Sequence, residues 1–218
     1  MRVVLCVFLV LLQIPLAAGL ASTQELSAPR PQITAHYEAS DHSLRFISQE
    51  PAPYTLTVRF PRFENATIDC EQPCTFVLAP HGQRRFSFAK LRPLDPWRFN
   101  YRYRYQRGDY RAQPQLKFVY HLPYARGANY KIGQAYDGSF THKGKNRFAL
   151  DFGLPLGTPV HAARAGQVIW TVDRFAEGGI DDAFRGKDNR VEILHADGTI
   201  GLYGHLQRHG VKVSPGDL

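Results

Sequence analysis

Three residues in the C-terminal half of the sequence, His142, Asp151 and His205, are of the types that bind metal ions and transfer protons. Asp151 stands between Leu150 and Phe152 in an apolar stretch, where an ionised carboxylate costs free energy unless it is paired or bound to a metal. A lone histidine is usually a surface residue or a hydrogen-bonded core residue. The two histidines are therefore interpreted from the motifs that surround them.

Six short motifs follow one another around these residues. They are Gly138–Gly144 (GSFTHKG), Arg147–Phe152 (RFALDF), Gly157–Val160 (GTPV), Ala162–Val168 (AARAGQV), Val191–Gly198 (VEILHADG) and Tyr203–Leu206 (YGHL). In this order, over residues 136–217, they resemble the lysostaphin-type (M23) zinc endopeptidases, which cut peptide bonds in bacterial cell walls. The resemblance implies an antiparallel β-sheet peptidase domain, Zn²⁺ as cofactor and a peptidoglycan peptide as substrate.

The resemblance also implies a role for each candidate residue. His142 and Asp151 become zinc ligands, and His205 becomes the catalytic histidine beside the metal, acting as a base or a transition-state stabiliser. A catalytic zinc site needs three protein ligands and an open position where water is activated. The turn at Gly157–Val160 and the hairpin at Asn189–Gly198 supply framework only.

The sequence departs from the family pattern in two places. Eight residues separate His142 from Asp151, more than the commonest spacing in the family, so the segment must turn back, and Gly144 and Asn146 favour such a turn. Pro215-Gly216-Asp217 resembles the turn before the family's His-x-His motif, and the sequence given ends at Leu218. We therefore expect a fragment that lacks the third zinc ligand, with little or no activity. The alternative is a non-catalytic relative that binds cell wall or regulates another hydrolase.

The first 21 residues predict export. A positive start and an apolar run from Val3 to Leu16 lead to small residues that end at Ala21, as in a cleaved secretory signal peptide. We expect a periplasmic or secreted protein without a transmembrane segment after cleavage. Cys70 and Cys74 then remain, and in an oxidising compartment this close pair predicts a structural disulfide.

The net charge is basic but does not identify a partner. The full sequence carries +8, and removing the one arginine of residues 1–21 leaves +7. Such a surface suits an anionic partner, including the cell-wall polymer. The lysines and arginines form no block, so nothing indicates nucleic acid, and the oligomeric state is not indicated either.

Short strands separated by turn residues predict an all-β chain with two domains. Residues 22–121 are expected to form an immunoglobulin-like sandwich, with strands at 54–60, 75–78, 85–88, 99–105 and 116–120. Within it, Tyr101 to Tyr105 alternates tyrosine with arginine. This pattern indicates either one buried aromatic face and one solvated basic face, or an aromatic surface that stacks on sugars or bases.

Residues 122–218 are expected to form the peptidase-like domain, with strands at 148–152, 160–163, 167–173, 190–195 and 199–203. The polar segment 174–188 is interpreted as a surface loop that could shape a substrate groove. His161, His195 and His209 are interpreted as an ordinary strand residue, a hairpin residue and a loop residue. A barrel-sandwich carrier or adaptor would explain the Gly166 and Gly216 turns but not His142, Asp151 and His205, and no heptads accompany it.

Overall fold

A computed structural model describes residues 30–179, 181–184 and 186–218. The predicted signal peptide lies outside these ranges. The described chain is almost entirely β, as the sequence predicts, and forms two compact units, Arg30–Ala112 and Gln113–Leu218. None of its described helices is long and apolar enough to cross a membrane.

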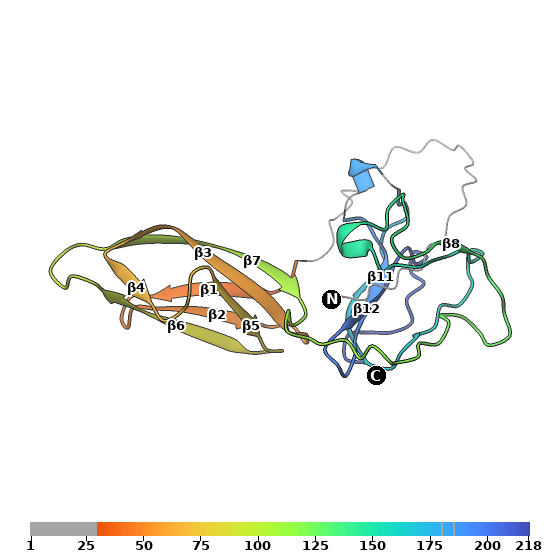
Figure 1. The fold of residues 1–218 in the computed structure, drawn as a ribbon, viewed down its shortest axis with the longest axis horizontal. Helices are drawn as coiled ribbons and strands as arrows, with labels where there is room; N and C mark the ends of the chain where they lie inside the picture. Colours follow the sequence, from red (N-terminus) through yellow and green to blue (C-terminus); the bar gives the residue numbers. More distant parts are fainter. Residues whose placement is uncertain (1–29, 180, 185) are drawn as a thin grey trace. The chain divides into compact units, whose positions relative to one another are not determined.

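The N-terminal unit is a sandwich of two antiparallel sheets (Figure 1). The first has the order β1-β2-β6-β4 and the second the order β5-β3-β7. The strands are β1 (Ile33–Glu38), β2 (Ser43–Ser48), β3 (Tyr54–Glu64), β4 (Ala66–Ile68), β5 (Cys74–Leu78), β6 (Gln83–Lys90) and β7 (Arg98–Arg107).

Aromatic rings join the two sheets of this sandwich. Phe46 of β2 is fully buried and lies 5.4 Å from Phe76 of β5 and 5.3 Å from Tyr103 of β7, measured between ring centroids. Tyr101 and Tyr103 of β7 therefore point inward. Of the two interpretations, the inward-facing aromatic side of the strand is the one the structure shows, although Tyr105 at its end is 43 % exposed. Cys70 and Cys74 form the expected disulfide, which closes the turn before β5.

The C-terminal unit contains a three-stranded antiparallel sheet and a separate strand pair. The sheet has the order β10-β11-β12, formed by β10 (Gln167–Val172), β11 (Arg190–Leu194) and β12 (Ile200–Tyr203). The pair joins β8 (Ile132–Gln134) to β9 (Asp151–Phe152). Phe152, Val168, Ile193 and Tyr203 bring both into one apolar core.

Two of the expected strands do not form. Residues 116–120 and 160–163 are extended or turning chain without a strand ladder. Individual hydrogen bonds hold these segments in place instead. The Tyr203 hydroxyl accepts a hydrogen bond from the Ala163 backbone N–H (2.7 Å), and the His121 backbone N–H donates to the Ala163 carbonyl (2.9 Å). Similarly, the strand expected at 148–152 is reduced to Asp151–Phe152.

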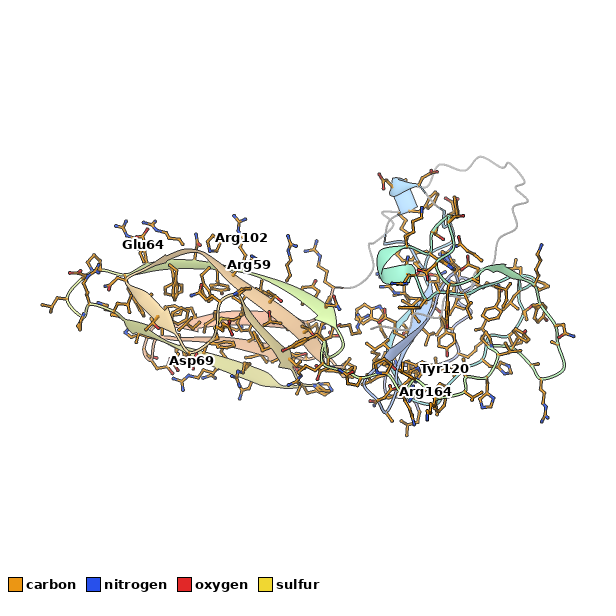
Figure 2. All side chains as sticks on the ribbon, viewed as in Figure 1. Arg59, Glu64, Asp69, Arg102, Tyr120 and Arg164 are labelled. Atoms are coloured by element: carbon orange, nitrogen blue, oxygen red, sulfur yellow. A yellow bond between two sulfur atoms is a disulfide. The ribbon has the colours of Figure 1, made fainter. Side chains whose placement is uncertain are left out.

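A buried ion pair fixes the segment that follows Ala112. The Arg164 guanidinium lies 2.7 Å from Asp197 and rests on two rings, with its central carbon 4.1 Å from the Phe118 centroid and 5.6 Å from the Tyr120 centroid. Figure 2 labels Arg164 and Tyr120 together. The Asp197 carboxylate also accepts a hydrogen bond from the backbone N–H of Gln115 (3.0 Å), so this cluster attaches residues 113–121 to the β11–β12 turn.

His195 is a second buried polar residue of this sheet, with 3 % of its surface exposed. Its Nδ1 lies 2.9 Å from the Ala165 carbonyl oxygen and so carries the proton. Its Nε2 faces Gly201, where an added Cβ would stand 2.8 Å away, and has no hydrogen-bond partner within the described part of the chain. His195 thus lies at the end of the β11–β12 hairpin, as expected, and its side chain packs in the core.

Candidate metal centre

The centre is built by β8, β9 and the loop between them. Gln134 and Asp151 are register partners across the β8–β9 pair. The intervening loop contains a 3₁₀ turn, η1 (Gly144–Asn146). Its backbone hydrogen bonds run from the Asn146 N–H to the Lys143 carbonyl (3.1 Å) and from the Arg147 N–H to the Gly144 carbonyl (3.3 Å). This turn occupies the long spacing seen in the sequence and returns Asp151 to His142.

His142 and Asp151 are in direct contact. His142 Nε2 lies 2.9 Å from Asp151 Oδ1, and the His142 side chain is only 1 % exposed. On the other side of the ring, Nδ1 lies 2.8 Å from the Ala135 carbonyl oxygen, which can only accept a hydrogen bond. Nδ1 therefore carries a proton, and Nε2 is the nitrogen directed at the carboxylate.

This arrangement matches the usual surroundings of a metal-binding histidine. A backbone carbonyl bound to one ring nitrogen fixes the tautomer and leaves the other nitrogen for the metal. His142 Nε2 and Asp151 Oδ1 lie 2.9 Å apart at this position. Two donors of the zinc-binding types, histidine nitrogen and carboxylate oxygen, thus converge on one point.

Both carboxylate oxygens of Asp151 are engaged. Oδ1 contacts His142, and Oδ2 accepts a hydrogen bond from Gln134 Nε2 (3.1 Å). Burial raises the pKa of Asp151, and the His142, Gln134 and His205 side chains oppose that rise. The carboxylate is therefore held in a fixed orientation in a partly desolvated place.

Gln134 is a site residue that the sequence did not reveal. Its Nε2 donates to Asp151 and to the Thr141 hydroxyl (2.8 Å), while its Oε1 accepts the amides of Phe140 (3.1 Å) and Thr141 (3.3 Å). One side chain thus fixes both the candidate ligand Asp151 and the loop that carries His142. Only the strand register brings Gln134 to Asp151, and no motif indicates it.

Gly138 leaves the space that Gln134 fills. A Cβ at this position would stand 2.3 Å from Cγ and 2.7 Å from Cδ of Gln134, and the glycine is not in the left-handed region. Gly138→Ala should therefore displace Gln134 and lower the free energy of unfolding by about 2 kcal/mol. Thermal unfolding of the purified variant measures this loss.

Gly133→Ala is the matched control for this prediction. It lies next to Gln134 in β8, and its added Cβ would meet nothing closer than the Asp151 carbonyl oxygen at 3.9 Å. We expect a change within about 0.5 kcal/mol. Equal effects of the two substitutions would show that the packing of Gln134 over Gly138 is not important.

His205 follows the end of β12 with a left-handed backbone, φ 56°. Asp188 holds this conformation, because its Oδ1 accepts the His205 amide (3.0 Å) and lies 3.9 Å from His205 Nδ1. Partial desolvation lowers the pKa of His205, while the charges of Asp188 and Asp151 oppose that change. His205 and Asp151 each affect the pKa of the other through their charges, and no hydrogen bond or ion pair joins the two among the contacts described above.

With this geometry established, comparison with known proteins identifies the segment. Residues 145–218 match the model of peptidase family M23. This segment, about a third of the chain, is similar to the M23 peptidases. The match includes Asp151 and His205, and His142 lies just before its first matched residue. No curated protein and no solved structure matches the chain.

Asn189 supports the matched segment and is buried directly before β11. Its side-chain amide exchanges hydrogen bonds with the backbone of Phe175 (2.9 and 2.8 Å) and donates to the Leu206 carbonyl (3.0 Å). Asn189 thereby closes the base of the segment 174–188 and fixes the residue after His205. The described part of that segment contains the short turn η2 (Asp182–Phe184).

His142 and Asp151 have the donor atoms that a zinc site uses, and they would supply two of the three protein ligands that a catalytic site needs. Among the residues that the structure describes, no group of three His, Cys, Asp or Glu side chains could hold a metal ion. The structure thus brings the two expected ligands together and places His205 in their surroundings, but it provides no third ligand within the described ranges.

Proposed function

We propose that this M23 domain is a zinc endopeptidase that hydrolyses peptide bonds of bacterial cell-wall peptidoglycan, in a protein that is exported. The observation that carries the proposal is the contact between His142 Nε2 and Asp151 Oδ1. Asp151 lies within the segment that matches the peptidase family, and His142 lies just before it. The carbonyl of Ala135 sets the histidine tautomer that metal binding requires.

Each side chain of the centre has a specific task in this proposal. His142 Nε2 and Asp151 Oδ1 would hold two of the coordination positions of the metal. A bound zinc ion supplies Lewis acidity, which polarises a carbonyl group and lowers the pKa of a bound water molecule. Gln134 keeps Asp151 in place, so that the carboxylate does not have to reorient.

His205 is suited to move a proton. Desolvation lowers the pKa of His205 and so favours the neutral ring, which can accept a proton from an attacking water molecule. Asp188 holds the backbone of His205 and lies near Nδ1, which would stabilise the ring once it is charged. These are the roles of a general base and of the residue that positions it.

Two features support export. Residues 1–21 have the pattern of a secretory signal peptide. Cys70 and Cys74 form a disulfide, a bond that persists in oxidising compartments and is rare in the cytosol. Peptidoglycan lies outside the cytoplasm, so a substrate in the wall requires such a location.

A second function is favoured by one observation, the lack of a three-residue metal cluster among the described residues. With two ligands, the 218-residue chain should bind zinc weakly and hydrolyse peptides slowly or not at all. In that case the M23 domain would bind the wall or regulate another hydrolase without catalysis.

Incubation of the purified 218-residue chain with cross-linked muropeptides separates the two functions. Mass spectrometry would follow new amino termini with added zinc chloride, with a chelator, and in the His205→Ala variant. Zinc-dependent cleavage that this variant lacks supports the peptidase. Binding of muropeptides without cleavage supports the non-catalytic function. If the chain neither binds nor cleaves muropeptides, both functions are contradicted.

A further inference from the structure

The outer side of the β5-β3-β7 sheet carries a cluster of arginines. Inward positions of β7 hold aromatic rings, since Tyr101 and Tyr103 contact Phe46 of the other sheet. Alternate positions of β7 from Arg98 to Gln106 are exposed and point the other way. The β3 residues Arg59 and Arg62 are register partners of that outward set, on either side of a bulge. We call this outward set the arginine face, formed by Arg59, Arg62, Arg98, Arg102 and Arg104.

Arginines of this face lie directly opposite one another. Arg59 of β3 is the register partner of Arg102 of β7, and Arg104 follows two residues later on the same side. Figure 2 shows Arg59 and Arg102 beside each other, with Glu64 farther along the same side. Like charges at opposed positions of an antiparallel pair are destabilising, so the fold itself does not favour this placement.

Few carboxylates neutralise the face. Glu64 forms an ion pair with Arg62 (2.9 Å). With five arginines and one glutamate, the net charge of the face is +4. In the described ranges, no carboxylate lies within ion-pair distance of Arg59, Arg102 or Arg104. Other arginines of the same unit are paired: Arg85 with Asp41, Arg92 with Asp95 and Arg111 with Asp109.

The composition of the face selects among anionic partners. The other exposed side chains on this side of the three strands include Thr75, Asn100 and Gln106, which can bind hydroxyl and amide groups. Tyr101 and Tyr103 of β7, whose rings could stack on bases, point inward. Tyr105 is 43 % exposed, but its ring lies on the opposite side of the strand from the arginines, against Tyr54. Large apolar side chains, which a bilayer surface would need for insertion, are not among the arginine face residues.

Arginine itself indicates the kind of anion. Its planar guanidinium binds carboxylates through two parallel hydrogen bonds, whereas lysine acts as a point charge. The outward positions of β3, β5 and β7 hold five arginines and no lysine. On one strand, side chains of the same face recur about every 6.7 Å, a spacing that suits a polymer with repeated carboxylates.

We propose that the arginine face binds the peptide carboxylates of cell-wall peptidoglycan, and so holds the polymer that the M23 domain acts on. This inference rests on the proposed function for the identity of the polymer. Binding two modules to one polymer raises the effective concentration of the second site without any new contact. The sandwich thereby becomes the module that retains the protein on its substrate.

Pulldown with purified sacculi tests this proposal on the full chain. The test variant is Arg59→Thr/Arg102→Thr/Arg104→Thr, and the control is Arg84→Thr/Arg85→Thr/Lys90→Thr on exposed positions of β6, with the same loss of charge. All samples contain a chelator, so that no zinc-dependent cleavage contributes. Thermal unfolding confirms that each variant is folded.

We expect the test variant to bind sacculi about tenfold more weakly, from three exposed pairs of about 0.5 kcal/mol each, and the control to bind within about twofold of the original. Amidation of the wall carboxylates should abolish the difference between the proteins. Sacculi with and without attached phosphate polymers should bind alike.

Three results would overturn the inference. These are equal binding by the test and control variants, unchanged binding to amidated sacculi, and preferential binding to anionic phospholipid vesicles or single-stranded DNA at the same salt concentration. The result is independent of the proposed catalysis, because every sample contains a chelator and the compared variants differ only in residues of the sandwich. A failure here leaves the peptidase proposal standing, and the reverse also holds.

Discussion

His142→Ala is expected to lower the zinc affinity of the protein at least about 100-fold, because changes in outer-shell partners alone cost up to about that much. The substitution removes the ring nitrogen that points at Asp151 Oδ1 and the hydrogen bond that sets its tautomer. The remaining carboxylate would be a single ligand. Calorimetric titration with zinc chloride measures the loss.

His161→Ala is the matched control for this titration. His161 lies in the same unit and is exposed, so its removal should leave the affinity unchanged. Asp151→Asn, which keeps the shape of the side chain, should reproduce the effect of His142→Ala if the two groups bind one ion. Unchanged affinity in both site variants would mean that zinc binds elsewhere.

Arg164→Met is expected to lower the free energy of unfolding by about 3 kcal/mol, because it leaves a largely buried carboxylate without its cation. The two side chains are 5 % and 11 % exposed, so water cannot replace the lost partner well. Burial alone would raise the pKa of Asp197, but hydrogen bonds from Thr199, the Gln115 amide and Arg164 hold it well below its usual range. Urea unfolding, followed by tryptophan fluorescence, reports the change.

Arg147→Met provides the comparison with an exposed pair of the same unit. Its ion pair with Asp137 has side chains that are 53 % and 62 % exposed, and such pairs contribute about 0 to 1 kcal/mol. Adding Asp197→Asn to Arg164→Met should recover part of the loss, since the uncompensated charge is then gone. No recovery would locate the effect in the rings of Phe118 and Tyr120 rather than in the charge.

The strands that periodicity predicted well are those in which sequence and packing agree. In β7 the alternation of tyrosine and arginine corresponds to an inner and an outer face. Residues 116–120 and 160–163 have strand-like composition but make isolated contacts, through Arg164 and the Tyr203 hydroxyl, rather than a ladder. Local composition cannot distinguish these cases, because ladder formation depends on a distant partner.

The candidate site shows the same division. His142, Asp151 and His205 could be named from motifs, because their types and order are visible in the sequence. Gln134 and Asp188 could not, because each acts on a residue 17 positions away through a single side-chain oxygen or nitrogen. The turn at Gly144–Asn146 was expected from its residues, and the structure shows how it brings His142 and Asp151 into contact.

The buried imidazole of His195 makes the C-terminal unit sensitive to mild acid. Burial lowers the pKa of His195 in the folded chain, whereas an unfolded histidine titrates near about 6.5. The contribution of this group to stability is thus complete above about pH 6.5 and is lost as the pH falls from there towards the lower pKa of the folded state. A proton added to Nε2 would meet Gly201 and no acceptor. Unfolding midpoints should therefore fall on acidification through this window in the original protein, but less in a His195→Gln variant. An acidic environment would then shorten the lifetime of this unit through proton uptake by a residue that has no part in the metal centre.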